Sequence, residues 1–175
     1  MGEPEPYEIE RKFLIRYPDL ALLESLPNCT KVEIIQTYLL SGTLDAETRV
    51  RQRGSDGQYI FTEKSKKRVS EMKRIETERR ITQAEYLALL MNTDTTLHQI
   101  RKTRYCLSYK NQYLEIDIYP FWQNYAVVEV ELSDENQTIV FPDFIDVIKE
   151  VTEDISYSNR GLAECLPSEK SVVGK

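Results

Sequence analysis

The sequence predicts an α+β fold in which antiparallel strands close into a β-barrel, with a few helices packed around it. Most of the 175 residues fall into short segments that alternate polar and apolar side chains, as half-buried strands do. Few segments show helical spacing. Charged residues alternate along nearly every predicted strand, and a closed barrel explains this pattern because it gathers one face of each strand in a shared interior.

The composition indicates one globular domain over residues 1–175. Hydrophobic residues make up 41% of the chain and charged residues 30%. The net charge of −6 argues against binding to duplex nucleic acid or to an anionic membrane, so a polyanion site requires a local concentration of Lys and Arg. The acidic N-terminus does not resemble a signal peptide, and the 3 cysteines lack metal-ligand spacing, so we expect a cytoplasmic protein with structural thiols.

The first part of the chain alternates between predicted strands and one helix. Strands are expected at residues 7–14, 32–40, 46–53 and 58–64. The helix lies between the first two strands, where Leu20, Leu23 and Leu26 have helical spacing and Pro27 ends the pattern. The Gly-Ser-Asp-Gly segment at 54–57 predicts a hairpin turn. The charged stretch 65–73 is expected to be a loop.

The second part adds further hairpins and a mixed tail. Strands are expected at residues 73–81, 99–109, 112–119 and 125–132. Thr82 and Glu85 have the spacing of a capping box, which predicts a helix beginning at this point. Lys110 and Asn111 predict a tight turn between two strands. Residues 141–166 are expected to form short helices.

Charged side chains share one face of most predicted strands. They are Glu8, Glu10 and Lys12; Arg49, Arg51 and Arg53; Arg74, Glu76 and Glu78; Lys102 and Arg104; Glu115 and Asp117; and Glu129 and Glu131. For any one strand a solvent-exposed face is the simplest interpretation, because charged residues mostly lie outside. Taken together, the strands favour a charged interior, which is costly unless its charges are paired, hydrated or bound to ions.

The two kinds of charge indicate one kind of ligand. Clustered carboxylates with few His or Cys residues favour hard divalent cations such as Mg²⁺ or Mn²⁺. Clustered Arg and Lys favour phosphate oxygens, which Arg can bind through two hydrogen bonds. Both sets in one interior predict a site for a metal-bound polyphosphate, whose metal would bridge carboxylate and phosphoryl oxygens.

The order of these residues resembles the CYTH superfamily, the triphosphate tunnel metalloenzymes. The resemblance rests on E-x-E-x-K at residues 8–12, then QTYL (36–39), RVR (49–51), Lys64, RIETE (74–78), KTR (102–104), EID (115–117), EVE (129–131), KEVTED (149–154) and YSN (157–159). It covers almost the whole chain. It implies an eight-stranded antiparallel β-barrel that forms a tunnel around a triphosphate.

The resemblance also implies a role for each charged residue of the series. Phosphates would be bound by Lys12, Arg49, Arg51, Lys64, Lys102 and Arg104, with Arg74 and Lys149 as further basic residues of the site. Metal would be bound by Glu8, Glu10, Asp117, Glu129 and Glu131. Further acidic residues of the tunnel would be Glu76, Glu78 and Glu115.

Lys12, Lys64 and Tyr38 are the candidate catalytic residues. The face of Tyr38 could bring its hydroxyl near Lys64, and a Tyr–Lys pair can transfer protons. The alternative is an ordinary aromatic residue in the barrel wall. Trp122 and Tyr125 are likewise either stacking partners for an organic group or packing residues.

We expect metal-dependent hydrolysis of inorganic triphosphate (tripolyphosphate) to pyrophosphate and phosphate. The alternative within the superfamily is an adenylyl cyclase or another enzyme of nucleoside or thiamine triphosphates. A binding module without catalysis needs the basic residues more than the acidic set, and a structural barrel leaves the buried charge unexplained. The expected partner is a small-molecule triphosphate, and the oligomeric state stays open, with a homodimer as one option.

Overall fold

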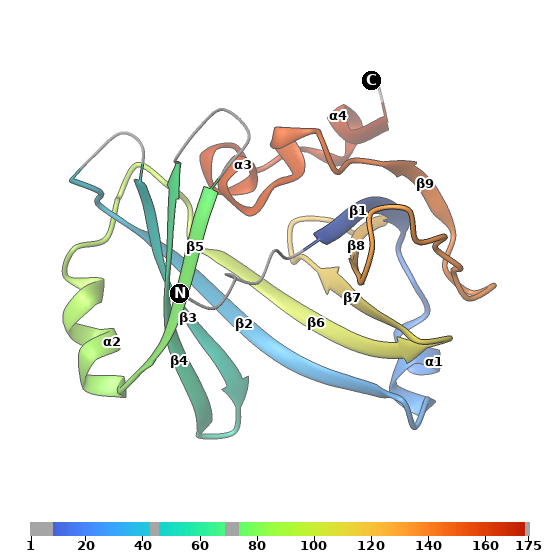
Figure 1. Cartoon of the computed structure of the whole chain (residues 1–175), viewed down its shortest axis with the longest axis horizontal. Coiled ribbons are helices and arrows are strands. Elements are labelled where there is room, and N and C mark those ends of the chain that lie inside the picture. The colour runs from blue at the N-terminus through green and yellow to red at the C-terminus, as the bar shows by residue number, and fades with distance from the viewer. Residues whose placement is uncertain (1–8, 43–45, 69–73, 174–175) are drawn as a thin grey trace. The chain divides into compact units, whose positions relative to one another are not determined.

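The computed structural model describes residues 9–42, 46–68 and 74–173, and the chain divides into two compact units (Figure 1). The first unit consists of Met1–Lys31, Thr103–Tyr157 and Ser168–Lys175. The second unit consists of Val32–Lys102 and Ser158–Pro167. Each unit has its own hydrophobic cluster.

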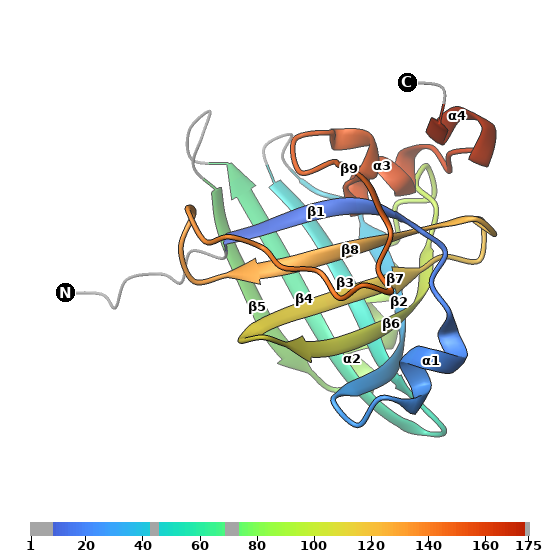
Figure 2. The ribbon, with the colours of Figure 1, turned by 90° about the vertical axis from the view of Figure 1, so that its right-hand side faces the viewer.

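The strands form one hydrogen-bonded series. They are β1 (Ile9–Arg16), β2 (Cys29–Leu39), β3 (Ala46–Ser55), β4 (Gln58–Arg68), β5 (Arg74–Ile81), β6 (Ile100–Tyr109), β7 (Gln112–Ile118), β8 (Tyr125–Leu132) and β9 (Val147–Glu150). Their order in the sheet is β5-β4-β3-β2-β6-β7-β8-β1-β9. Figure 2 shows β1, β8, β7 and β6 lying side by side, and the pairings among them are antiparallel.

The helices are short. They are α1 (Leu20–Ser25), α2 (Gln83–Leu90), the 3₁₀ helix η1 (Ile155–Tyr157), α3 (Asn159–Glu164) and α4 (Glu169–Val173). Among the residues that the structure describes, no helix is both long and apolar enough to span a membrane.

The predicted α+β class is confirmed, but the predicted closed, eight-stranded barrel is wrong. Over the described ranges the sheet has nine strands and two ends, β5 and β9. Strand β1 pairs with β8 on one side, and β9 pairs with β1 at Phe13, Leu14 and Ile15 on the other. The physical reason lies in the tail, where residues expected to be helical form β9. Strand β9 is hydrogen-bonded to the edge of β1 that would have to pair with another strand in a closed eight-stranded sheet.

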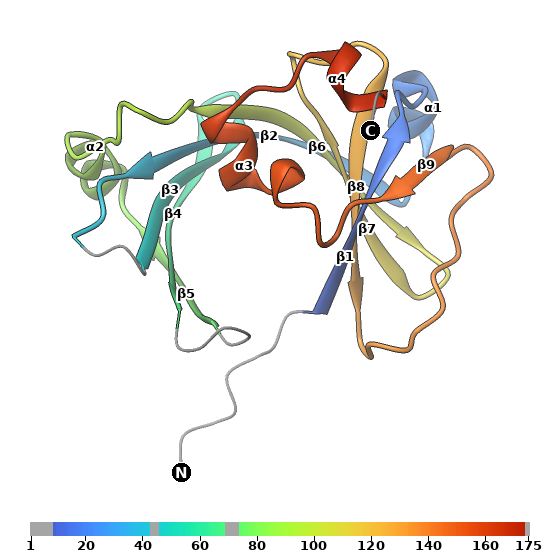
Figure 3. The same ribbon diagram turned by 90° about the horizontal axis from the view of Figure 1, so that it is seen from above.

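In the second unit, one face of the sheet packs against α2. The cluster consists of Leu39, Val50, Phe61, Ile81 and Tyr86. The predicted capping box begins α2, because the Thr82 N–H donates to Glu85 Oε2 at 2.7 Å and the Glu85 N–H donates to Thr82 Oγ1 at 3.1 Å. Figure 3 shows α2 and α3 on opposite sides of these strands. Since strand side chains alternate, the face away from α2 carries Arg49, Arg51 and Lys64.

The first unit follows the same rule. Its apolar cluster includes Phe13, Ile15, Leu114, Ile116, Val128 and Val130, together with Leu23 of α1. These residues alternate with charged ones, so Lys12 of β1 and Glu129 of β8 lie on the opposite face. The unit therefore separates a hydrophobic core from a charged face by strand periodicity alone.

Two tight turns set the register of the hairpins. Asp56 and Gly57 have φ of 54° and 79°, and Lys110 and Asn111 have φ of 47° and 57°. Positive φ at both central residues is the type I′ geometry that suits two-residue hairpins, as the sequence predicted. Strand β4 continues to Arg68, so the start of the predicted loop at 65–73 is strand, and residues 69–73 lie outside the described part.

Leu114→Ala tests the core of the first unit. Leu114 is fully buried, and removing its side chain should lower the free energy of unfolding by about 2–5 kcal/mol through lost burial and the cavity left behind. Urea denaturation measures this change. The control is Leu87→Ala on α2, where the side chain is 56% exposed and the change should stay within about 0.5 kcal/mol. Equal effects from both substitutions would contradict the assigned core.

Candidate active site

The charged face of the first unit is built by the pairing of β1, β8 and β7. Lys12 lies directly opposite Glu129, and Lys12 Nζ is 3.1 Å from Glu129 Oε1. Lys12 Nζ also donates to the backbone carbonyl of Tyr157 at 3.3 Å. The predicted E-x-E-x-K lysine is thus held between a carboxylate and the tail segment.

Arg104 is the centre of this face. Its Nε and Nη2 donate to Asp117 Oδ1 and Oδ2 at 2.7 and 2.8 Å, a bidentate pair. Arg104 also donates to Glu115, and its Nη2 lies 3.7 Å from Glu129 Oε2. Burial acts to lower the pKa of Arg104, but the charges of the three surrounding carboxylates outweigh it and raise that pKa above its usual value. The guanidinium is therefore permanently charged.

Carboxylates oppose one another in two cross-strand pairs. Glu10 lies opposite Glu131 in the pairing of β1 with β8, and Glu115 lies opposite Glu129 in the pairing of β7 with β8. Burial raises the pKa of Glu115; Arg104 opposes this, and the charge of Glu129 adds to it. Like charges directly opposite one another are unfavourable unless a cation relieves them. Arg104 does so for Glu115 and Glu129.

The carboxylates of this face have the chemistry that suits a hard divalent cation. The predicted ligands are all carboxylates, and Glu10 and Glu131 are paired residues of the adjacent strands β1 and β8. Within the described ranges, no three His, Cys, Asp or Glu side chains are arranged as a ready metal site. The predicted ligand Glu8 lies outside the described residues. The predicted metal ligands among the described residues are Glu10, Asp117, Glu129 and Glu131.

The second unit carries the basic face. Arg49 lies opposite Lys64 in the pairing of β3 with β4. Arg51 Nη2 lies 2.9 Å from Glu78 Oε1, and Lys64 Nζ lies 3.1 Å from Glu76 Oε1. Two predicted phosphate-binding residues are therefore already engaged by acids of β5 that the sequence assigned to the same face.

Tyr38 contacts this basic face through its hydroxyl. Arg49 Nη1 donates to Tyr38 Oη at 3.4 Å, and Tyr38 is 1% exposed. Burial raises the pKa of Tyr38, against the opposing effect of Arg49, so the phenol is neutral at physiological pH. The structure gives Arg49, rather than Lys64, as the hydrogen-bond donor to this hydroxyl. A catalytic role for Tyr38 stays a prediction.

Three other predicted basic residues are Lys102, Lys149 and Arg74. Lys102 is 2% exposed, and its Nζ donates to Asn159 Oδ1 at 3.5 Å within the second unit. In the first unit Lys149 Nζ lies 5.4 Å from the centre of the Tyr157 ring. The backbone of Arg74 pairs with that of Arg68 at the end of β5.

Two neutral residues beside Arg51 were missed by sequence reasoning. Gln36 of β2 and Thr62 of β4 lie opposite Arg51 on either side. Gln36 Oε1 and Thr62 Oγ1 are buried and have no hydrogen-bond partner in the part of the chain that the structure describes. The available signal was spacing: each residue lies two positions from an assigned one, Tyr38 or Lys64, and so shares its face.

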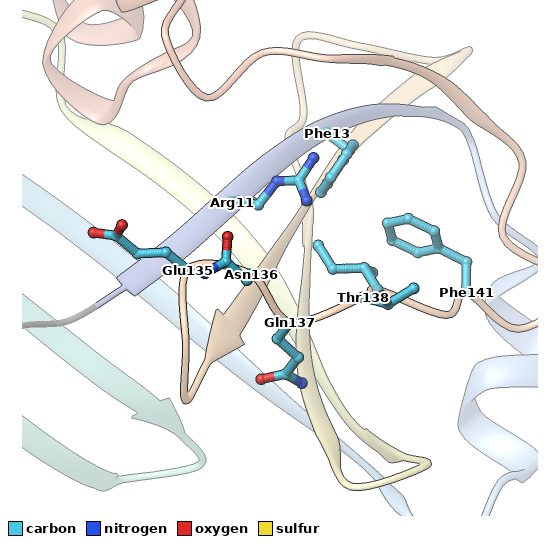
Figure 4. A pocket seen from close by; sticks show the side chains of 8 residues that line it. Arg11, Phe13, Glu135, Asn136, Gln137, Thr138 and Phe141 are labelled. Atoms are coloured by element: carbon cyan, nitrogen blue, oxygen red, sulfur yellow. The ribbon is translucent and has the colours of Figure 1, made fainter.

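A separate pocket in the first unit lies on the other face of β1 (Figure 4). It has a volume of about 420 Å³ and is lined by Arg11, Phe13 and Phe141, among others. Arg11 Nε and Nη2 each donate to Glu150 at 2.7 Å, and this pair neutralises the charge of the guanidinium. This pocket therefore does not match a polyphosphate.

Trp122, one of the two aromatic residues considered as stacking partners, is part of a buried aromatic cluster. Trp122 is 2% exposed and packs edge-on against Tyr119 and Phe121, at centroid distances of 5.6 and 5.3 Å. Tyr157 lies 6.3 Å from Trp122. This packing supports the simpler interpretation of Trp122 as a structural residue.

An antiparallel sheet with basic residues and paired carboxylates opposite its apolar clusters is the arrangement expected of the CYTH superfamily. A CYTH domain model matches residues 6–161, and the chain belongs to this family. It is 33% identical over 165 residues to an inorganic triphosphatase of Nitrosomonas europaea, covering 91% of this chain and 99% of that protein. These findings confirm the predicted family and the prediction that the chain is an enzyme.

Solved structures agree with this assignment. The crystal structure of the inorganic triphosphatase NE1496 matches with a TM-score of 0.59 and 31% identity, covering 93% of this chain and 98% of that one. The structure of the PH1819 protein from Pyrococcus horikoshii OT3 matches with a TM-score of 0.51 and 18% identity, over 74% of this chain and 81% of that one. The second match shows a shared fold alone.

Arg104→Met tests the charge balance of the first unit. With the guanidinium gone, buried carboxylates lose their counter-charge, and the free energy of unfolding at pH 7 should fall by about 3 kcal/mol or more. Denaturation in the presence of EDTA measures this loss. It should shrink as the pH is lowered towards 5, because the folded variant then takes up protons at the carboxylates that have lost Arg104 more readily than the unfolded chain does.

The matched control is Arg16→Met. Arg16 also has a carboxylate partner, Asp146 at 3.0 Å, but both side chains are 66% exposed. Solvent screens this pair, so stability should change little at either pH. An Arg104→Met variant as stable as Arg16→Met would contradict the assigned role of Arg104.

Proposed function

We propose that this chain hydrolyses inorganic triphosphate to pyrophosphate and phosphate in a Mg²⁺- or Mn²⁺-dependent reaction. The observation that carries the proposal is the 33% identity to an inorganic triphosphatase over 91% of the chain. The basic residues and the opposed carboxylates on the charged faces of the sheet support it. Arg and Lys bind phosphate oxygens, whereas opposed carboxylates bind a divalent cation.

The basic residues would act by binding and orienting the phosphates. The residues proposed to bind phosphoryl oxygens are Lys12, Arg49, Arg51, Lys64, Arg74, Lys102, Arg104 and Lys149. Fixed cations neutralise the charge of a polyphosphate and hold it for attack, which is most of what a protein contributes to phosphoryl transfer.

The acidic residues would hold the metal. Glu10 and Glu131 are the first choice, because they oppose each other and a cation would relieve their repulsion. Glu129, Asp117 and Glu8 would complete the set, and Glu76, Glu78 and Glu115 would balance the basic residues. The bound ion would supply further neutralisation of phosphate charge. Since Arg104 already occupies both oxygens of Asp117, metal and guanidinium compete for that carboxylate.

The preference for inorganic triphosphate over nucleotides follows from the side chains present. The residues assigned to substrate are charged, and Trp122 is packed inside an aromatic cluster. Without contacts to base or ribose, the adenosine of ATP contributes nothing to transition-state stabilisation. A cyclase would additionally need to seat the ribose 3′-hydroxyl against the α-phosphate.

Glu10→Gln tests the metal assignment. The substitution keeps the shape of the side chain but removes one anionic ligand, so the Mg²⁺ concentration for half-maximal activity should rise by about tenfold or more. The measurement is phosphate release against Mg²⁺ concentration. Glu135→Gln serves as the control, because Glu135 lines the separate pocket and should leave the metal dependence unchanged. An unaltered Mg²⁺ curve for Glu10→Gln would remove Glu10 from the metal site.

Substrate comparison tests the reaction. With saturating Mg²⁺, and again with Mn²⁺, kcat/KM for inorganic triphosphate should exceed that for ATP and thiamine triphosphate, with orthophosphate and pyrophosphate as products. Product identification separates the alternatives. Cyclic AMP and pyrophosphate formed from ATP faster than triphosphate is hydrolysed would establish the cyclase instead.

A further inference from the structure

Gln36 and Thr62 are the two neutral polar residues that flank Arg51 on the charged face of the second unit. In the pairing of β2 with β3, Gln36 is directly opposite Arg51, and in the pairing of β3 with β4, Thr62 is directly opposite Arg51. Side chains opposite one another on adjacent strands lie on the same face, with Cβ atoms about 4.5–5.5 Å apart. Gln36 and Thr62 are therefore the immediate neighbours of Arg51 on this face, one on each side.

Both residues bury a polar atom that lacks a partner. Gln36 is 1% exposed, and over the described ranges neither Gln36 Oε1 nor Thr62 Oγ1 has a hydrogen-bond partner. A buried polar group without a partner is unfavourable, so such groups are rare in folded proteins. Two of them on either side of one arginine indicate a ligand that supplies the missing bonds.

The chemistry of the two atoms defines what each would bind. The Thr62 hydroxyl can donate a hydrogen bond, which suits a phosphoryl oxygen that Arg51 also binds. Gln36 Oε1 can only accept, so a phosphate anion does not suit it, whereas the O–H of a water molecule does. Hydrolysis needs one water molecule beside the phosphoryl group, and a neutral acceptor there orients it without repelling the phosphate.

We infer that Gln36 positions the attacking water, and Thr62 the phosphoryl group, at Arg51. This inference rests on the proposed triphosphatase function. The water oxygen forms a new bond to phosphorus while the bond from phosphorus to the bridging oxygen breaks, and the bridging oxygen leaves with the electron pair. The proton lost by the water passes to solvent or to the departing phosphate. Gln36 takes no proton; it is a positioning residue that acts through the orientation of the water.

Gln36→Met is the main test. Methionine has nearly the same length but no acceptor, so kcat for inorganic triphosphate should fall by about tenfold to a hundredfold while KM stays within about twofold. The melting temperature should not fall, because none of the residues that the structure describes donates a hydrogen bond to Oε1. A residue that merely supports the fold would show the reverse: a lower melting temperature and an unchanged kcat.

Three further variants sharpen the result. Gln36→Glu keeps an acceptor but adds a negative charge, so it should retain more of kcat than Gln36→Met while KM rises. Thr62→Val loses the donor to phosphate, and its KM should rise about tenfold. Gln52→Met is the matched control, since Gln52 follows Arg51 on β3 and points to the other face, and both kinetic constants should match those of the wild type.

The outcomes separate the two proposals. An active wild type whose kcat is unchanged by Gln36→Met overturns the positioning role alone and leaves an ordinary buried water as the partner of Oε1. A wild type that does not release phosphate from triphosphate overturns the proposed function and the positioning role together. A reduced kcat with unchanged KM and unchanged melting temperature supports both.

Discussion

The ion pair between Arg104 and Asp117 compensates the buried charge on the charged face of the first unit. Asp117 is fully buried, and an isolated charge in that position would be far too costly for a domain of marginal stability. The bidentate pair satisfies both of its oxygens, and Nη1 of Arg104 extends the compensation to Glu115. Removing one member of such a network costs more than the network itself contributes, because it leaves a charge without a partner.

In the second unit, too, the charged residues are compensated by residues of opposite charge, but these pairs are less buried. Arg51 and Lys64 are partly exposed, and each is paired with an acid of β5, Arg51 with Glu78 and Lys64 with Glu76. These pairs hold the cations in place before any ligand arrives. An incoming anion must interact with Arg51 and Lys64 more strongly than Glu78 and Glu76 do. A densely charged polyphosphate therefore has an advantage over a singly charged ligand. Preorganisation and selection for charge density thus come from the same contacts.

Much of this was predictable from alternation in the sequence. The period of two placed Arg49, Arg51 and Lys64 on one face and their apolar neighbours on the other, as the structure shows. Strand β9 was missed because Val147–Glu150 is too short to show a period, and its pairing with β1 comes from residues far away in the chain. The closed barrel was wrong for this reason, since local patterning does not report which strand takes a given edge.

The same limit applies to the site. Arg51 was predicted as a site residue because it is charged. Gln36 and Thr62 were not predicted because they are neutral, although all three share one face of the sheet. A neutral side chain becomes notable only when its burial and its missing partner are known, and neither is visible in a sequence. The hydrogen bond from Arg49 to Tyr38 is similar: alternation put both on one face, but the choice between Arg49 and Lys64 depends on side-chain geometry.

The turn at Lys110 and Asn111 has a consequence for how this chain can vary. Its two positive φ angles fix the length of the loop between β6 and β7, and so fix Arg104 opposite Asp117. One inserted residue would shift the pairing by a single position and exchange the polar and apolar faces of a strand. Surface loops usually tolerate insertions and deletions. This one should keep its length through evolution even if its residue types drift, although neither residue is proposed to touch substrate or metal.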